Sequence, residues 1–254
     1  FCAQASRHST GIPAYPLKNK EEMMEAAMQA KMMGAERFGI VTSGDELSKS
    51  ELTLVIDAVR EITGKTGIKV CASLGKISEE GFVFLKKAGL SRYHHNLETS
   101  EKYFTKIVTT HTYQERIDTI KAAKKAGLQV CSGGIIGMGE TLDDRIDLAL
   151  ALKELNVDSV PINVLVSING TPLDSINPLS AGEVIRAIAL FRIILKDKAI
   201  KIAAGRESVL KDFQALAFMA GANGMLIGGY LTVKGRAPQE DLQLAEEVKR
   251  LWQI

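Results

Sequence analysis

The chain has 254 residues, of which 46% are hydrophobic and 24% are charged, and its 32 Lys and Arg against 30 Asp and Glu leave a formal net charge of +2. This composition is typical of a globular protein and excludes a disordered or fibrous one. The nearly balanced charge gives no general attraction to nucleic acid or to an anionic membrane, so we expect neither as a partner.

Helical and strand-like segments alternate from about residue 18 to the end of the chain. The hydrophobic periodicity predicts helices at 19–33, 48–62, 78–88 and 113–126, from 141, from 180, and at 207–220 and 238–252. It predicts strands at 37–41, 68–73, 91–97, 128–132, 159–166, 200–204 and 224–228. Capping boxes open three of the helices: Ser48 with Glu51, Thr141 with Asp144, and Ser180 with Glu183.

Strands that alternate with helices of this length predict right-handed crossovers and a parallel sheet. The architecture that fits about 250 residues as a single domain is an α/β (β/α)8 TIM-type barrel, with one further strand expected before Phe1. An open doubly wound sheet is the alternative. No dinucleotide-binding glycine motif supports it, and the Gly64-Lys65-Thr66 segment has Val59 where a phosphate loop requires glycine.

The sequence has no apolar run of about 18 residues and no signal-like segment, so we expect a cytoplasmic protein without a membrane span. Its three cysteines, Cys2, Cys71 and Cys131, are odd in number and far apart. Such spacing argues against a disulfide framework. Each cysteine is therefore either a buried thiol or a metal ligand.

Polar or reactive residues stand at the carboxyl ends of successive predicted strands: Cys71, Asn96, Glu98, Cys131, Asn163 and Arg206. Singly, each has an ordinary explanation as a buried thiol, a turn residue or a surface ion pair. A barrel brings these positions to one mouth, which favours a shared site. Cysteines without an adjacent base favour an iron–sulfur cluster over a nucleophile, and a nearby Arg would offset the cluster's negative charge.

Zinc is disfavoured, because the four histidines lack zinc spacing and the adjacent His94 and His95 would point to opposite faces of a strand. The glycine-rich segment 133–140 (GGIIGMGE) follows a strand and precedes a capped helix. Small residues there would let a ligand approach the backbone near a helix N-terminus. A tight turn explains the same glycines equally well.

Several blocks resemble the biotin synthases, in order and over nearly the whole chain. They are 71–75 (CASLG), 93–100 (YHHNLETS), 109–116 (TTHTYQER), 130–141 (VCSGGIIGMGET), 159–165 (SVPINVL), 204–207 (AGRE) and 218–223 (FMAGAN). The resemblance implies a radical S-adenosylmethionine (radical SAM) enzyme that inserts sulfur between C6 and C9 of dethiobiotin. It also implies a 4Fe–4S cluster, S-adenosylmethionine and an auxiliary iron–sulfur cluster that supplies the sulfur.

Residues 1–7 (FCAQASR) resemble the end of the loop that carries the radical SAM cluster. Cys2 matches the third cysteine of that loop, and Phe1 matches the aromatic residue near the adenine. The other cofactor-binding positions of the family fall on Asn96, Glu98, Arg116, Ile135 and Val166. Glu98 stands where the family usually has Asp, and Arg116 matches the carboxylate-binding arginine.

The substrate positions of the family fall on His94, Asn96 and Asn163, and Asn163 matches the residue that holds the ureido ring. The auxiliary-cluster ligands fall on Cys71, Cys131 and Arg206, which makes these the expected catalytic residues. Two positions depart from the family pattern. The remaining cysteine position is Gly39, which leaves the cluster type open between two irons and four, and His94 replaces a common Asn.

The resemblance further implies a reducing partner such as flavodoxin or ferredoxin, and a homodimer. Two alternatives remain at this point. One is another radical SAM branch, of the hydrogenase maturase or methylornithine synthase type, which lacks the Cys131, Arg206, Asn96 and Asn163 combination. The other is a non-catalytic scaffold that stores or passes on iron and sulfur.

Overall fold

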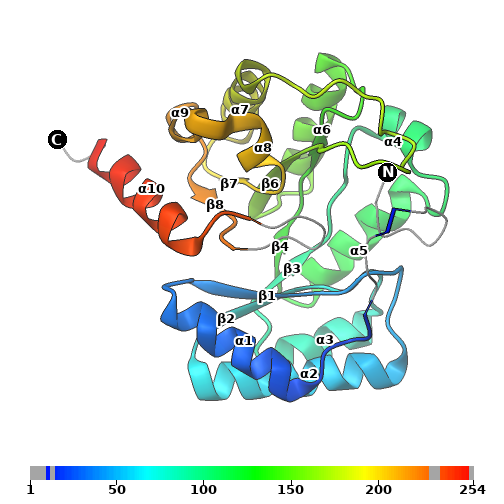
Figure 1. Cartoon of the computed structure of the whole chain (residues 1–254). Coiled ribbons are helices and arrows are strands. Elements are labelled where there is room, and N and C mark those ends of the chain that lie inside the picture. Colours follow the sequence, from blue (N-terminus) through cyan, green and yellow to red (C-terminus); the bar gives the residue numbers. More distant parts are fainter. Residues whose placement is uncertain (1–9, 12–14, 229–234, 252–254) are drawn as a thin grey trace. The chain divides into compact units, whose positions relative to one another are not determined.

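The computed structural model describes residues 10–11, 15–228 and 235–251, and these form two compact units (Figure 1). The N-terminal unit comprises residues 15–96 together with Gln114–Cys131. The C-terminal unit comprises residues 10–11, Leu97–Tyr113 and the described residues from Ser132 onwards. Among the described residues, no helix is both long and apolar enough to span a membrane.

The N-terminal unit is built from four parallel strands with helices between them. Its elements are α1 (Lys20–Met32), β1 (Arg37–Val41), α2 (Lys49–Thr66), β2 (Lys69–Ser73), α3 (Glu79–Lys87), β3 (Arg92–His94), α5 (Tyr113–Lys125) and β4 (Gln129–Cys131). The strands pair in chain order, β1 with β2, β2 with β3 and β3 with β4. Figure 1 shows α1, α2 and α3 on one side of β1 and β2.

The hydrophobic pattern explains how the helices attach to this sheet. Val55, Ala58, Val59 and Ile62 of α2 recur at helical spacing and are all fully buried. The predicted box of Ser48 and Glu51 caps the same helix through bonds in both directions. The caps predicted at Thr141 and Ser180 are also present, so the starts of these helices are confirmed.

The C-terminal unit also contains a parallel sheet, in the order β5-β6-β7-β8. Its elements are α4 (Glu101–Ile107), β5 (Gly134–Ile136), α6 (Leu142–Glu154), β6 (Ser159–Val164), α7 (Ala181–Leu195), β7 (Ala199–Ile202), α8 (Arg206–Leu210), the 3-10 turn η1 (Lys211–Phe213), α9 (Gln214–Met219), β8 (Gly224–Met225) and α10 (Pro238–Leu251). The predicted alternation of strands and helices is therefore confirmed in both units.

Three details differ from the sequence-based prediction. Residues 134–136 form strand β5, where we expected only a loop or a turn. Helix α4 was not predicted, and the predicted helix 207–220 is divided into α8, η1 and α9. Strand β5 has a steric reason: a Cβ at Gly134 would lie 2.3 Å from the carbonyl oxygen of Glu98, so glycine is needed for the two backbones to pair.

Candidate active site

The two described cysteines lie on the same face of the N-terminal sheet. Ala72 of β2, Tyr93 of β3 and Val130 of β4 form one row across the strands, and all three are buried. Successive side chains of a strand alternate between faces, so Cys71 and Cys131, each one position away from this row, point to the opposite face. Both thiols are buried and neither is in a disulfide.

Gly39, the position where the family has its further cysteine, lies directly beside Cys71 in the register of β1 and β2. It is exposed, and the one contact that a Cβ built on it would make within the described part of the chain is with the Cys71 sulfur, at 3.7 Å. The space beside the Cys71 thiol is therefore open on this side. Cys71 itself donates a weak hydrogen bond from Sγ to the carbonyl oxygen of Phe38, at 3.4 Å.

Two arginines that we did not predict share this face with the thiols. Arg92 pairs with Cys71 in the strand register, and Arg37 lies two residues before Gly39 on β1. Both guanidinium groups donate to the side-chain oxygen of Gln129, at 3.0 Å from Arg92 and 3.2 Å from Arg37. Among the described residues neither arginine forms an ion pair with a carboxylate, although Arg92 is buried.

This charge arrangement fits an anionic group on the thiol side. Burial, and then the like charge of Arg92, lower the pKa of Arg37, whereas the two thiols raise it. Two neighbouring cations without carboxylate partners are costly unless an anion offsets them. Among the described residues no group of three His, Cys, Asp or Glu side chains converges as the ligand set of a single metal ion. Two cysteines beside two arginines suit an iron–sulfur cluster better than a single metal ion. The protein ligands of a cluster bind different irons, so they need not converge on one point.

The N-terminal unit also brings together two residues expected to bind S-adenosylmethionine. Nη1 of Arg116, on α5, donates to the backbone carbonyl oxygen of Asn96 at 2.8 Å. This bond fixes the chain directly after β3, and both side chains remain half-buried. A guanidinium held this way has further N–H groups in a planar fork that matches a carboxylate.

In the C-terminal unit, Glu98 and Ile135 are joined through their backbones. The carbonyl oxygen of Glu98 accepts a hydrogen bond from the Ile135 amide at 2.9 Å. Glu98 has a φ of 72°, in the left-handed region that residues with a side chain seldom adopt. Such local strain is typical of binding and catalytic positions. Val166, the other predicted apolar contact, follows β6 and is half-buried.

Asn163, on β6, uses only part of its hydrogen-bonding capacity in the described contacts. Its Nδ2 donates to the carbonyl oxygen of Gly134 at 3.0 Å, and its Oδ1 accepts from the Ala204 amide at 3.2 Å. These bonds tie β6 to β5 and to the segment after β7, and they fix the plane of the amide. One N–H and one lone pair of the amide remain for a ligand that offers both an acceptor and a donor.

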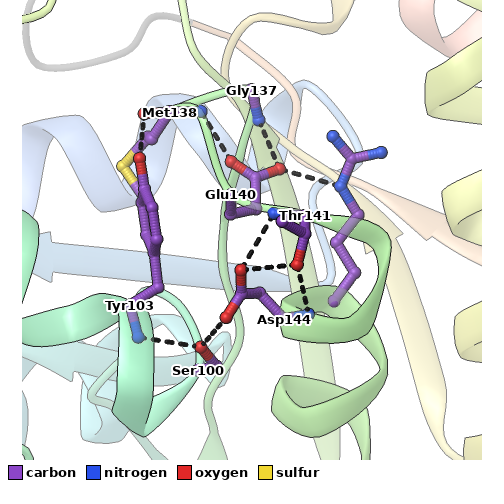
Figure 2. A network of polar contacts seen from close by, with 8 residues as sticks. Ser100, Tyr103, Gly137, Met138, Glu140, Thr141 and Asp144 are labelled. Atoms are coloured by element: carbon purple, nitrogen blue, oxygen red, sulfur yellow. Dashed lines mark hydrogen bonds and ion pairs between the residues drawn. The ribbon is translucent and has the colours of Figure 1, made fainter.

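The segment 137–140 is the end of the glycine-rich segment 133–140, for which the sequence left a binding loop and a tight turn open. A buried carboxylate holds it (Figure 2). Glu140 accepts hydrogen bonds from the amides of Gly137 at 2.8 Å and Met138 at 2.7 Å. Its other strong contact is an ion pair with Arg145 at 2.8 Å. The hydroxyl of Tyr103 donates to the Met138 carbonyl at 2.8 Å, so both sides of this turn are fixed.

A second carboxylate connects the same segment to α4. Asp144 accepts a hydrogen bond from the Ser100 hydroxyl at 2.6 Å and also caps α6 through Thr141 (Figure 2). Burial raises the pKa of Asp144, but the hydrogen bonds from Ser100 and Thr141 outweigh it and hold the pKa below its ordinary value. Ser100 caps α4, so one network orders α4, the turn and α6 together.

We expect Glu140→Gln to lower the free energy of unfolding of the apoprotein by about 3 kcal/mol, because it leaves the half-buried Arg145 without its charge partner and places an NH2 group against backbone amides. Urea unfolding would measure the change. The exposed Glu25→Gln is the matched control and should change stability by less than about 0.5 kcal/mol. Equal stability of the two variants would show that the Glu140 network does not hold this turn.

Arg206, predicted as a cluster ligand, lies buried at the start of α8 and is engaged by carboxylates. Its Nη2 contacts Asp241 of α10 at 2.6 Å and Glu207 at 3.2 Å, and its Nη1 donates to the side-chain oxygen of Gln214. Phe1 and Cys2 lie outside the described residues. Their roles, like the ligand role of Arg206, stay predictions.

The comparisons with known proteins place the chain in a family. The model of the Radical SAM superfamily matches residues 1–152, and the Biotin and Thiamin Synthesis associated domain matches residues 161–249. Over 252 residues the chain is 52% identical to the biotin synthase of Thermotoga petrophila, covering 99% of this chain and 84% of that protein. The chain belongs to the biotin synthase family. The biotin synthase of Pelotomaculum thermopropionicum is 48% identical over 249 residues, 98% of this chain and 78% of that one.

Solved structures define the fold of this family member. A methylornithine synthase matches with a TM-score of 0.84 over 98% of this chain and 77% of that one. The FeFe-hydrogenase maturase HydG from Carboxydothermus hydrogenoformans matches with a TM-score of 0.77 over 93% and 60%. Both are only 18% identical, so they show a shared fold alone. The fold is the radical SAM type of TIM barrel, as predicted, and the biotin synthase relatives decide against the two rival branches.

Proposed function

We propose that this chain converts dethiobiotin to biotin by inserting sulfur between C6 and C9, with an auxiliary cluster on Cys71 and Cys131 as the sulfur source. The observation that carries this proposal is the pair of buried thiols on one face of the sheet. They share this face with two arginines that have no carboxylate partner among the described residues. Membership of the biotin synthase family supports the substrate and the reaction. A storage scaffold would need no site for S-adenosylmethionine or for a ureido ring.

When bound, the 4Fe–4S cluster and S-adenosylmethionine supply the 5′-deoxyadenosyl radical, and the auxiliary cluster supplies sulfur. The chain's own residues hold these groups. Cys2 would ligate the radical SAM cluster, and Phe1 would bind the adenine, as the resemblance of residues 1–7 implies. Arg116 pairs with the carboxylate of S-adenosylmethionine, and Asn96, Glu98, Ile135 and Val166 complete its site. The bond from Arg116 to the Asn96 backbone supports this assignment, because it orders both residues before the cofactor binds.

The auxiliary cluster of this chain differs from the two-iron, three-cysteine centre of the family, because Gly39 offers no ligand. A four-iron centre that includes an exogenous sulfide accounts for the open space beside Cys71. We keep Arg206 as a proposed ligand from the resemblance. Its contacts with Asp241 and Gln214 favour instead a role in holding α8 against α10, since a guanidinium is ordinarily a cation and a donor.

The remaining proposals concern the domain organisation, the cellular location, the oligomeric state and the electron donor of the enzyme. We propose that the chain forms a single barrel domain, acts in the cytoplasm as a homodimer, and takes electrons from a flavodoxin or a ferredoxin. The length and composition support the single domain and the location, and the homodimer and the electron donor are implied by the resemblance alone.

The proposed function is tested with full-length protein, reconstituted with iron and sulfide under anaerobic conditions and given S-adenosylmethionine, a reductant and dethiobiotin. We expect biotin together with 5′-deoxyadenosine, both dependent on dethiobiotin. Each of the two new C–S bonds replaces one C–H bond, so two molecules of 5′-deoxyadenosine should form per biotin. A scaffold would form neither product, and another radical SAM branch would form 5′-deoxyadenosine that does not depend on dethiobiotin.

Asn163→Ala should weaken dethiobiotin binding by about tenfold or more, since an unpaired group in a closed site costs about 1–3 kcal/mol. The fixed amide plane of Asn163 presents the donor and the acceptor that a cyclic urea requires. Calorimetry with S-adenosylmethionine present measures the affinity. Ser167→Ala, an exposed residue after the same strand, is the control. Unchanged affinity in Asn163→Ala would remove this residue from the substrate site.

A further inference from the structure

His94 lies between the two thiols of the proposed auxiliary site. It is on β3, the strand between β2 with Cys71 and β4 with Cys131, and its register partner is Cys131 itself. His94 is two residues after Arg92, the register partner of Cys71, so its side chain points to the same face as both cysteines. The three potential ligands thus come from three adjacent strands.

The imidazole of His94 has a nitrogen without a partner. Its Nε2 is buried and makes no hydrogen bond among the described residues. A buried ring nitrogen normally forms a hydrogen bond, because leaving it unpaired costs free energy. Imidazole nitrogen is also a common ligand of iron, and in Rieske centres it replaces thiolate on one iron of a cluster. The unpaired nitrogen therefore indicates that a bound group, such as iron, occupies the space beside the thiols and contacts Nε2.

Two cations share the face of the sheet on which His94 lies. Arg92 stands two residues before His94 on β3, and Arg37 lies on β1. Among the described residues neither arginine forms an ion pair with a carboxylate. An anionic cluster beside His94 would offset the charge of both.

We propose that His94 is a protein ligand of the auxiliary iron–sulfur cluster, coordinating iron through Nε2 beside the thiolates of Cys71 and Cys131. This role replaces the substrate contact expected for His94, and it rests on the proposed function, which requires a second cluster. It compensates for the ligand missing at Gly39. With two thiolates, one imidazole and one exogenous sulfide, each iron of a four-iron centre has its own ligand outside the cluster core. His94 thereby takes the place that the resemblance gives to Arg206, whose guanidinium is engaged by Asp241 and Gln214.

The test uses the full-length protein, reconstituted with iron and sulfide and labelled with nitrogen-15 only in histidine. Pulsed EPR of the reduced protein, without S-adenosylmethionine, should detect coupling of a histidine nitrogen to a cluster. The coupling should disappear in His94→Asn and persist in His111→Asn, a control outside the site. In His94→Asn, the auxiliary iron should pass to a chelator about tenfold faster or more, as expected for a weakened ligand set.

A second variant, His94→Cys, shows whether the iron loss in His94→Asn comes from the missing ligand or from a folding defect. This variant should restore retention of auxiliary iron, because thiolate replaces imidazole, yet it should lack the nitrogen coupling. If the second cluster assembles in the parent protein but shows no coupling to a histidine nitrogen, the His94 proposal is wrong. The proposed function still holds in that case if the protein forms biotin. Failure of any second cluster to assemble overturns both.

Discussion

Cys71→Ala and Cys131→Ala are each expected to abolish biotin formation and to leave cleavage of S-adenosylmethionine intact. The two thiols share a buried face of the N-terminal sheet and lie on different strands, so neither can take over the coordination of the other. Removing one thiolate leaves the auxiliary cluster with too few ligands, whereas the radical SAM cluster is held elsewhere. Radical generation and sulfur insertion should therefore separate in these variants.

Measuring 5′-deoxyadenosine and biotin in the same reaction checks this expectation. Thr53→Ala, an exposed position on α2 outside the site, is the control for handling and reconstitution and should form both products. Biotin at the parent yield from either cysteine variant would remove that cysteine from sulfur donation. Loss of 5′-deoxyadenosine as well would contradict the assignment of the two thiols to a separate auxiliary cluster.

Cys2→Ala should have the opposite effect and abolish reductive cleavage of S-adenosylmethionine. The resemblance of residues 1–7 to the radical SAM cluster loop makes Cys2 one of the three thiolates that hold this cluster. Without it the cluster loses the ligand set that supports electron transfer to the cofactor. Neither 5′-deoxyadenosine nor biotin should form.

The auxiliary site provides the internal control for Cys2→Ala. Because Cys71 and Cys131 are unchanged, iron bound at the auxiliary site should remain after reconstitution. Parent rates of 5′-deoxyadenosine formation in the Cys2→Ala protein would refute the assignment of the opening segment. Together with the variants at Cys71 and Cys131, this experiment separates the two clusters by their products.

The fold could be predicted from sequence because its signals are local. The caps at Ser48, Thr141 and Ser180 mark helix starts, and the apolar stripe of α2 from Val55 to Ile62 marks its buried face. Strand β5 was not predicted, because glycine in a sequence more often indicates a turn. Here Gly134 lets its backbone approach and pair with that of Glu98. Helix α4 is only seven residues long, too short for a clear period, although Ser100 and Glu101 carried a capping signal.

The candidate site was only partly predictable. Cys71 and Cys131 stand out by residue type, but Arg37 and Arg92 resemble ordinary surface cations until the strand register places them on the thiol face. Likewise, the contact of Arg206 with Asp241 joins segments far apart in sequence, which no local pattern reveals. Pairing across strands and helices is long-range information, and it is this information that the structure adds.

The most direct test of the account is the origin of the sulfur in biotin. Full-length protein is reconstituted with isotopically labelled sulfide, freed of excess sulfide, and allowed one turnover with dethiobiotin, S-adenosylmethionine, reductant and unlabelled sulfide in solution. Mass spectrometry of the biotin should then show the label, and Cys131→Ala should form no labelled biotin. Biotin that carries only unlabelled sulfur would contradict an auxiliary cluster on Cys71 and Cys131 as the sulfur source.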